Sequence, residues 1–257
     1  MFISHRSAQL YTVEFGSGPH TLLAIGGWAG SWELWTGPFQ FLSRSWRAVA
    51  YDHRGTGATL APAESITMEN MVDDLFALMD KMEIDQCVLA AESAGGMVAA
   101  QAVLQQKQRF EGLVLVDALL HQEGDKSKSA LLQGLKNNFK ETIENFVDAC
   151  VPPEQENSAE FRSWGRKILF RSPPEAAIRL LECTYGVDLR PDLAQIDVPT
   201  LLLHGDRDVI VPLRDSEFAS SQIPNSHLHV FRGAGHVPTV TCPREVADQI
   251  NQFFRKD

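Results

Sequence analysis

The sequence predicts an α/β fold, a mostly parallel, doubly wound sheet, with a small helical cap inserted after the sixth strand. Short apolar runs alternate with segments of helical period, which is the pattern of strands joined by crossover helices. Several runs are apolar on both faces, as strands covered by helices on both sides must be. The predicted strands are residues 11–14, 21–25, 48–51, 87–90, 113–116, 200–203 and 228–231.

The individual elements follow from local patterns. The first run alternates polar and apolar residues ahead of a Gly-Ser-Gly-Pro turn, so we expect an antiparallel hairpin strand at the sheet edge. Thr67 is a suitable N-cap, with Asn70 three residues later and an apolar stripe running to Met82. Two further helices are predicted over residues 93–104 and 244–254.

Residues 121–190 interrupt the alternation of strand and helix. This stretch is polar and helical in character, contains two Pro-Pro pairs and has no convincing strand. We therefore expect an α/β core formed by residues 1–120 and 191–257, with residues 121–190 as a helical cap or lid. The interpretation is one domain with a lid.

Charge and composition exclude several classes of partner. The 257-residue chain has 33 acidic and 23 basic residues, a formal net charge of −10. Binding to nucleic acid needs a basic surface, and an anionic membrane would repel this chain. No signal peptide and no spanning segment of about 18 apolar residues is recognisable. Its four scattered cysteines suit buried positions in a reducing compartment, so we expect a cytoplasmic protein.

The strongest chemical signal follows the predicted strand 87–90. There the chain reads Ala91-Glu92-Ser93-Ala94-Gly95-Gly96, a serine among small residues where a strand gives way to a helix. Such a turn is typical of a nucleophile held in a strained conformation, with small neighbours because the backbones pass closely. The alternative is a serine that only caps an ordinary helix.

An acid and a histidine follow later strands. Asp208 lies just beyond residues 200–203, where a carboxylate can orient a histidine. Asp206 is the second choice and Asp117, after residues 113–116, a third. The alternative for Asp206 and Asp208 is a pair of surface turn residues that only cap the helix starting near Pro212. His236 stands in a glycine-rich loop after the last strand, although a lone loop histidine is usually just solvated.

A glycine-rich loop follows the predicted strand 21–25. Consecutive glycines at 26 and 27 allow a backbone N–H to point into a cavity. We expect the amides of Trp28 and Ala94 to form an oxyanion hole, the second at a helix N-terminus. The alternative is a flexible turn. Residues 51–57, after the next strand, are expected to support the site.

The order Ser93, Asp208, His236, each after a predicted strand, resembles the α/β-hydrolase superfamily over nearly the whole chain. Two positions depart from the usual pattern: Gly26 stands where histidine is common, and Ala91 where glycine is common. The motifs that carry the resemblance are Asp52-His53-Arg54-Gly55-Thr56-Gly57, Ser93-Ala94-Gly95-Gly96, Gly205-Asp206-Arg207-Asp208 and Gly235-His236.

The resemblance implies a serine hydrolase that cleaves a small-molecule carboxylic ester or lactone. Ser93, His236 and Asp208 would act as a triad through an acyl-enzyme, without a metal or organic cofactor. Trp32 and Trp164 are expected to line an apolar pocket, unless they only pack the lid down. A monomer or a homodimer would both suit the sequence.

Other chemistries on the same triad stay open. They are C–C bond hydrolysis, perhydrolysis and cofactor-free oxygenation, and a hydrolase-like ligand receptor is a further alternative. The serine excludes haloalkane dehalogenases and epoxide hydrolases, which need aspartate at this turn. Proline-specific peptidase activity is less expected, because the loop at 26–29 lacks a Gly-Gly-x-Gly pattern.

Overall fold

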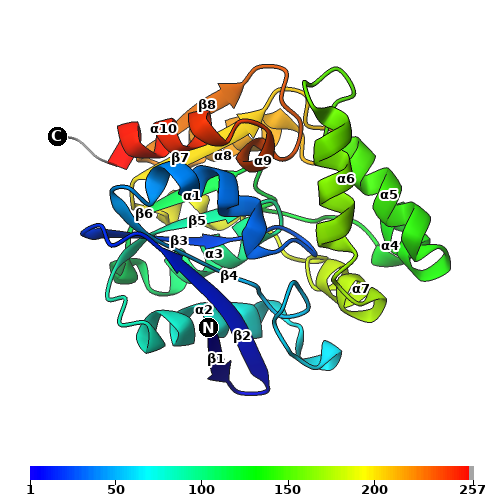
Figure 1. The fold of residues 1–257 in the computed structure, drawn as a ribbon, viewed down its shortest axis with the longest axis horizontal. Coiled ribbons are helices and arrows are strands. Elements are labelled where there is room, and N and C mark those ends of the chain that lie inside the picture. Colours follow the sequence, from blue (N-terminus) through cyan, green and yellow to red (C-terminus); the bar gives the residue numbers. More distant parts are fainter. Residues whose placement is uncertain (255–257) are drawn as a thin grey trace.

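The computed structural model describes residues 1–254, which form one eight-stranded sheet with helices on both faces (Figure 1). The strand order is β1-β2-β4-β3-β5-β6-β7-β8. β2 pairs antiparallel with β1 and β4, and the other neighbouring strands are parallel. The predicted mostly parallel, doubly wound sheet is confirmed.

Each predicted strand lies within an observed one or overlaps it. The strands are β1 Phe2–His5, β2 Ala8–Phe15, β3 His20–Ile25, β4 Trp46–Tyr51, β5 Cys87–Glu92, β6 Phe110–Val116, β7 Thr200–Gly205 and β8 Ser226–Phe231. The α-helices are α1 Thr36–Leu42, α2 Met68–Lys81, α3 Gly95–Gln105, α4 Ala130–Asn137, α5 Phe139–Cys150, α6 Ser158–Leu169, α7 Pro174–Glu182, α8 Leu213–Gln222, α9 Pro238–Thr241 and α10 Pro243–Phe254. Short 3-10 helices are η1 Trp32–Trp35, η2 Ala63–Ser65, η3 Lys107–Arg109, η4 Lys126–Lys128 and η5 Arg190–Gln195.

The sheet separates two apolar layers, because successive side chains of a strand point to opposite faces. In β3, Leu23 packs in the layer that contains Leu75 of α2. Its neighbour Leu22 packs in the other layer, with Phe39 of α1 and Ile250 of α10. Strands that are buried on both faces explain the continuous apolar runs in the sequence.

Helix α2 begins as predicted. The Thr67 hydroxyl accepts a hydrogen bond from the backbone N–H of Asn70 at 3.1 Å, which satisfies one of the free amides of the first turn. None of the helices within residues 1–254 combines the length and the apolar character that crossing a bilayer requires.

The chain between β6 and β7 is helical. It contains η4, α4, α5, α6, α7 and η5, and Figure 1 shows α4–α7 grouped at one end of the sheet. Within the described residues its extended pairing is limited to an isolated bridge between His121 and Asp188. The division into a core and a cap at residues 121–190 stays a prediction.

Candidate active site

Ser93 occupies a strained turn between β5 and α3. Its φ of 52° lies in the left-handed region, which is costly for a residue with a side chain. Three backbone hydrogen bonds hold it there. The N–H of Ser93 donates to Val116, and its carbonyl accepts from Gly96 and Leu119, all at 2.9 Å. The structure therefore has the strained strand-to-helix turn that the sequence predicts.

Glycines around this turn are required by space. A Cβ on Gly95 would lie 2.5 Å from the carbonyl oxygen of Gly26, and one on Gly96 would lie 2.7 Å from Cβ of Ala118. A Cβ on Gly27 would lie 2.9 Å from Cβ of Ser93. The loop after β3 thus packs directly against the serine.

The three residues of the predicted triad form a hydrogen-bonded chain. Nε2 of His236 lies 2.8 Å from Oγ of Ser93, and Nδ1 lies 2.6 Å from Oδ2 of Asp208. The His236 backbone N–H donates to the carbonyl of Cys150 in α5 at 2.8 Å, which anchors the loop. Because a carboxylate only accepts, Nδ1 carries the proton and Nε2 is free to accept one from Ser93.

The Asp208 side chain is buried, and both of its carboxylate oxygens accept hydrogen bonds. Its second oxygen, Oδ1, accepts from the backbone N–H groups of Ile210 at 2.7 Å and Val211 at 3.0 Å. His204, whose pKa burial lowers, lies 3.5 Å from Oδ2. A surface turn residue would not be enclosed in this way. Asp206, the second choice, instead accepts from the backbone N–H of Gly233 at 2.7 Å at an exposed position.

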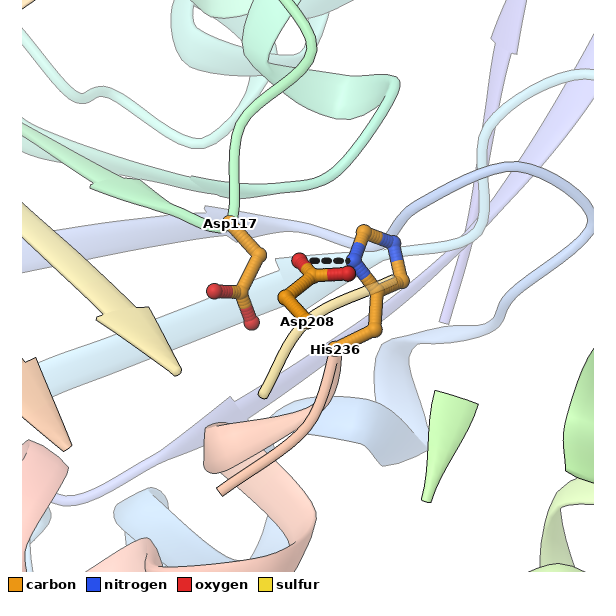
Figure 2. Close-up of side chains that lie close together, drawn as sticks. All are labelled: Asp117, Asp208 and His236. Atoms are coloured by element: carbon orange, nitrogen blue, oxygen red, sulfur yellow. Dashed lines mark hydrogen bonds and ion pairs between the residues drawn. The ribbon is translucent and has the colours of Figure 1, made fainter. Parts of the chain in front are cut away.

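Asp117, the third candidate acid, lies beside the pair. Figure 2 shows its carboxyl group next to that of Asp208, on the side away from His236. Its Oδ1 accepts from the backbone N–H of Gly205 at 2.9 Å, and its Oδ2 has no partner within residues 1–254. Burial, followed by the charge of Asp208, raises the pKa of Asp117 well above its usual range. These shifts favour a protonated Asp117.

Asp117, Asp208 and His236 also form the cluster best placed to hold a metal ion within the described residues. One donor atom from each lies within 4.8 Å of the others. However, Nδ1 of His236 is already bonded to Asp208, whose other oxygen accepts two amide hydrogens. Metal binding would have to break the link between the acid and the histidine, so the donor set fits a hydrogen-bonded chain better.

His53 contacts the loop that is predicted to form the oxyanion hole. Nε2 of His53 lies 3.0 Å from the carbonyl oxygen of Gly27. Nδ1 of the same ring lies 3.2 Å from the carbonyl oxygen of Arg54, and burial lowers the pKa of His53, so the neutral ring donates its one hydrogen to one of these two carbonyls. Within residues 1–254 the backbone N–H groups of Trp28 and Ala94 have no acceptor, which leaves both available to a ligand.

A small apolar cavity of about 50 Å³ adjoins Ser93. Trp164 lines it, as expected. Trp32, also expected there, is not among its lining residues, because its ring packs against Phe15 with the centroids 5.8 Å apart. Its backbone N–H donates to Oδ1 of Asp52 at 2.8 Å. The lining side chains that the sequence did not single out are Leu34, Phe146, Val147, Cys150, Val151, Leu169, Val237 and Val240.

Glu92 is the one carboxyl group among the cavity-lining residues of the described chain. It is buried and accepts a hydrogen bond from Oγ1 of Thr239 in α9 at 2.8 Å. Burial raises its pKa to about 7, against the effect of that hydrogen bond. An uncharged Glu92 leaves the cavity nearly neutral below that pH.

Comparison with known proteins places the chain in a family. A family model described as "Serine aminopeptidase, S33" matches residues 39–240. The chain belongs to this family of α/β-hydrolases. The family match covers β4 to α9, and with them Ser93, Asp208 and His236.

Individual relatives extend over nearly the full length. A pimeloyl-(acyl-carrier protein) methyl ester esterase from Nitrosomonas europaea is 26% identical over 254 residues, covering 93% of this chain and 96% of that protein. A Karrikin insensitive 2 receptor IA from Petunia hybrida is 25% identical, covering 93% and 92%. The structure of a thermophilic esterase from Thermogutta terrifontis has a TM-score of 0.89 and 25% identity, covering 96% and 93%.

Proposed function

We propose that the chain is a serine hydrolase that cleaves a small, largely apolar carboxylic ester or lactone. The observation that carries this proposal is the continuous hydrogen-bonded chain from Ser93 through His236 to Asp208, with distances of 2.8 and 2.6 Å. Relatives with esterase names support the same reaction class.

The proposed mechanism begins with proton transfer from Ser93 to Nε2 of His236. Oγ then attacks the substrate carbonyl, and Asp208 stabilises the imidazolium that forms. The amides of Trp28 and Ala94 stabilise the oxyanion, a contribution of about 3–4 kcal/mol for each donor where it has been measured. His236 returns its proton to the leaving alkoxide. A water molecule, activated in the same way, then hydrolyses the acyl-enzyme.

The cavity lining favours a neutral substrate. Apart from Ser93, Glu92 and His236, its side chains are apolar or absent within the described residues. An aminopeptidase has to bind a terminal ammonium group, and the one carboxyl group available for it, Glu92, is already bonded to Thr239 and has its pKa raised to about 7. We therefore propose an ester or lactone in preference to a peptide.

The experiment that tests the mechanism is covalent labelling. An alkyl fluorophosphonate should modify wild type stoichiometrically, and peptide mass spectrometry should place the label on Ser93. The His236→Ala variant should label much more slowly, because its serine lacks the general base. Label on any other residue, or equal labelling rates for the two proteins, would overturn the mechanism. An aminoacyl p-nitroanilide turned over faster than p-nitrophenyl esters would overturn the substrate class.

A ligand receptor is the second candidate, because a relative of nearly full length has a receptor name and an apolar cavity adjoins Ser93. A receptor would show negligible ester turnover with a ligand-dependent rise in Tm. A hydrolase would show Ser93-dependent turnover instead.

A further inference from the structure

Trp28 separates two cavities. The first is the cavity beside Ser93. The second is small, about 20 Å³, and its apolar walls come from Met68, Met71, Val98 and Leu180. Within residues 1–254, Trp28 is the one residue that lines both cavities. Trp28 therefore lies between the two cavities.

The indole is held firmly in place. Its Nε1–H donates to the carbonyl oxygen of Ala177 in α7 at 2.8 Å, and both groups are buried. Its ring makes an edge-to-face contact with Phe146 of α5, with centroids 5.0 Å apart. A hydrogen bond on one side and a packed ring on the other restrict the rotation of the side chain. Trp28 is thus a rigid wall that is tied to two helices between β6 and β7.

Ser93 and Ala94, adjacent in the chain, line different cavities. Ser93 lines the first and Ala94 the second. A hydrocarbon chain bound with its carbonyl at Ser93 would need to pass only the position of the indole to reach the second space. The methionines there are unbranched and flexible, and they adapt to such a chain at low cost. His53 and Thr184 are the polar members of this lining, and neither is negatively charged.

We propose that the second cavity is a latent subsite for the end of a linear hydrocarbon group, and that the Trp28 indole closes it and so sets the length of the substrate. The inference rests on the proposed ester hydrolase function. The backbone N–H of residue 28 remains in every substitution, so the oxyanion donor and the wall can be separated by mutation.

The test compares chain-length profiles of kcat/KM. Wild type, Trp28→Ala and Trp28→Phe are assayed with p-nitrophenyl esters from acetate to dodecanoate and with acetates of linear alcohols of the same lengths. We expect Trp28→Ala to move the optimum to longer chains in one series, with a gain of about fourfold for each additional methylene that the second cavity takes up. Trp28→Phe loses the hydrogen bond but keeps an aromatic ring that closes the second cavity, so it should keep the wild-type chain-length optimum.

A filling mutation tests where the added chain goes. Met68 is half-buried at the start of α2 and lines the second cavity but not the first. The double variant Trp28→Ala/Met68→Trp should return the optimum to the wild-type length, whereas Met68→Trp alone should leave the profile unchanged. Trp28→Leu serves in the same comparison if Trp28→Ala fails to fold by circular dichroism.

The outcomes distinguish this proposal from the proposed function. If wild type shows no Ser93-dependent turnover of any ester, the proposed function fails. If wild type is active and Trp28→Ala or Trp28→Leu keeps the wild-type chain-length optimum in both series, Trp28 does not limit substrate length. The proposed hydrolase function is unaffected by that result. An optimum that shifts in Trp28→Ala and stays shifted in the double variant shows that the chain does not use the second cavity, which also overturns the proposal. The rate at which fluorophosphonates of increasing alkyl length label Ser93 gives a second measure of chain-length preference in each variant. This measure does not depend on hydrolysis of an acyl-enzyme.

Discussion

Asp208 uses its two carboxylate oxygens for different tasks. One accepts the Nδ1 hydrogen of His236 at 2.6 Å, and the other accepts two backbone hydrogens of its own loop, from Ile210 and Val211. The backbone of residues 208–211 therefore fixes the Asp208 carboxylate, and the carboxylate in turn orients the imidazole ring of His236. We therefore expect catalysis to depend more on the negative charge at position 208 than on the shape of the side chain.

Asp208→Asn should lower kcat by about 10⁴-fold with a small effect on KM, because an asparagine can favour the wrong tautomer of His236 and does not stabilise its charged form. Asp117→Asn should keep activity within about tenfold, since Asp117 does not contact the histidine in a hydrogen bond. Asp206→Asn, at an exposed turn, is the matched control. Measuring kcat and KM of the three variants with one ester shows which aspartate is the acid of the triad. A larger loss of kcat in Asp117→Asn than in Asp208→Asn would assign that role to Asp117.

The positions of Ser93, Asp208 and His236 could be predicted because each depends on local sequence. Each follows a strand, and the carboxyl ends of parallel strands meet at one edge of a sheet. The small residues beside Ser93 also reflect close backbone contacts within a few residues. These signals do not require knowledge of how distant helices pack.

The cavity could not be predicted in the same way. Phe146 and Val240 reach it through the packing of α5 and α9, for which the sequence has no distance information. Trp32 was misplaced because its ring packs against Phe15 of β2, a contact between segments far apart in the sequence. Strand β1 was missed because it has only four residues, and its one buried side chain, Ile3, packs in the apolar layer that contains Leu75 of α2.

The buried carboxyl of Glu92 should make stability depend on pH. Its folded pKa, about 7, lies above the ordinary value of 4.5, so its stabilising contribution is complete below pH 4.5 and is lost as pH rises through 7. The shift corresponds to about 3 kcal/mol at alkaline pH.

Glu92→Gln keeps an acceptor for Thr239 without a titrating group. We therefore expect Glu92→Gln to be more stable than wild type at pH 8.5 and nearly equal to it at pH 4, below the ordinary pKa of glutamate. Urea denaturation at the two pH values measures this difference. A gap between the two proteins that does not change with pH would show that Glu92 is not the group responsible.

A buried ion pair links the loop after β4 to α2. Nε and Nη2 of Arg54 lie 2.6 and 2.8 Å from the two carboxylate oxygens of Asp74, and both side chains are almost fully buried. Arg54→Met should lower the free energy of unfolding by about 3–5 kcal/mol, because it leaves Asp74 buried with only the partly buried His5 as an ionisable partner.

The paired variant Arg54→Met/Asp74→Leu removes both charges and should recover most of this loss. Urea denaturation of the single and double variants gives the comparison. Equal stability of Arg54→Met and wild type would mean that the pair contributes nothing to the fold.

The most direct test of the proposed hydrolase is turnover of p-nitrophenyl esters from acetate to decanoate by wild type, Ser93→Ala and His236→Ala. We predict measurable hydrolysis by wild type and a loss of more than about 10³-fold in kcat for both variants, with folding unchanged by circular dichroism. Equal rates for wild type and Ser93→Ala would contradict the assignment of Ser93 as the nucleophile and, with it, the proposed function.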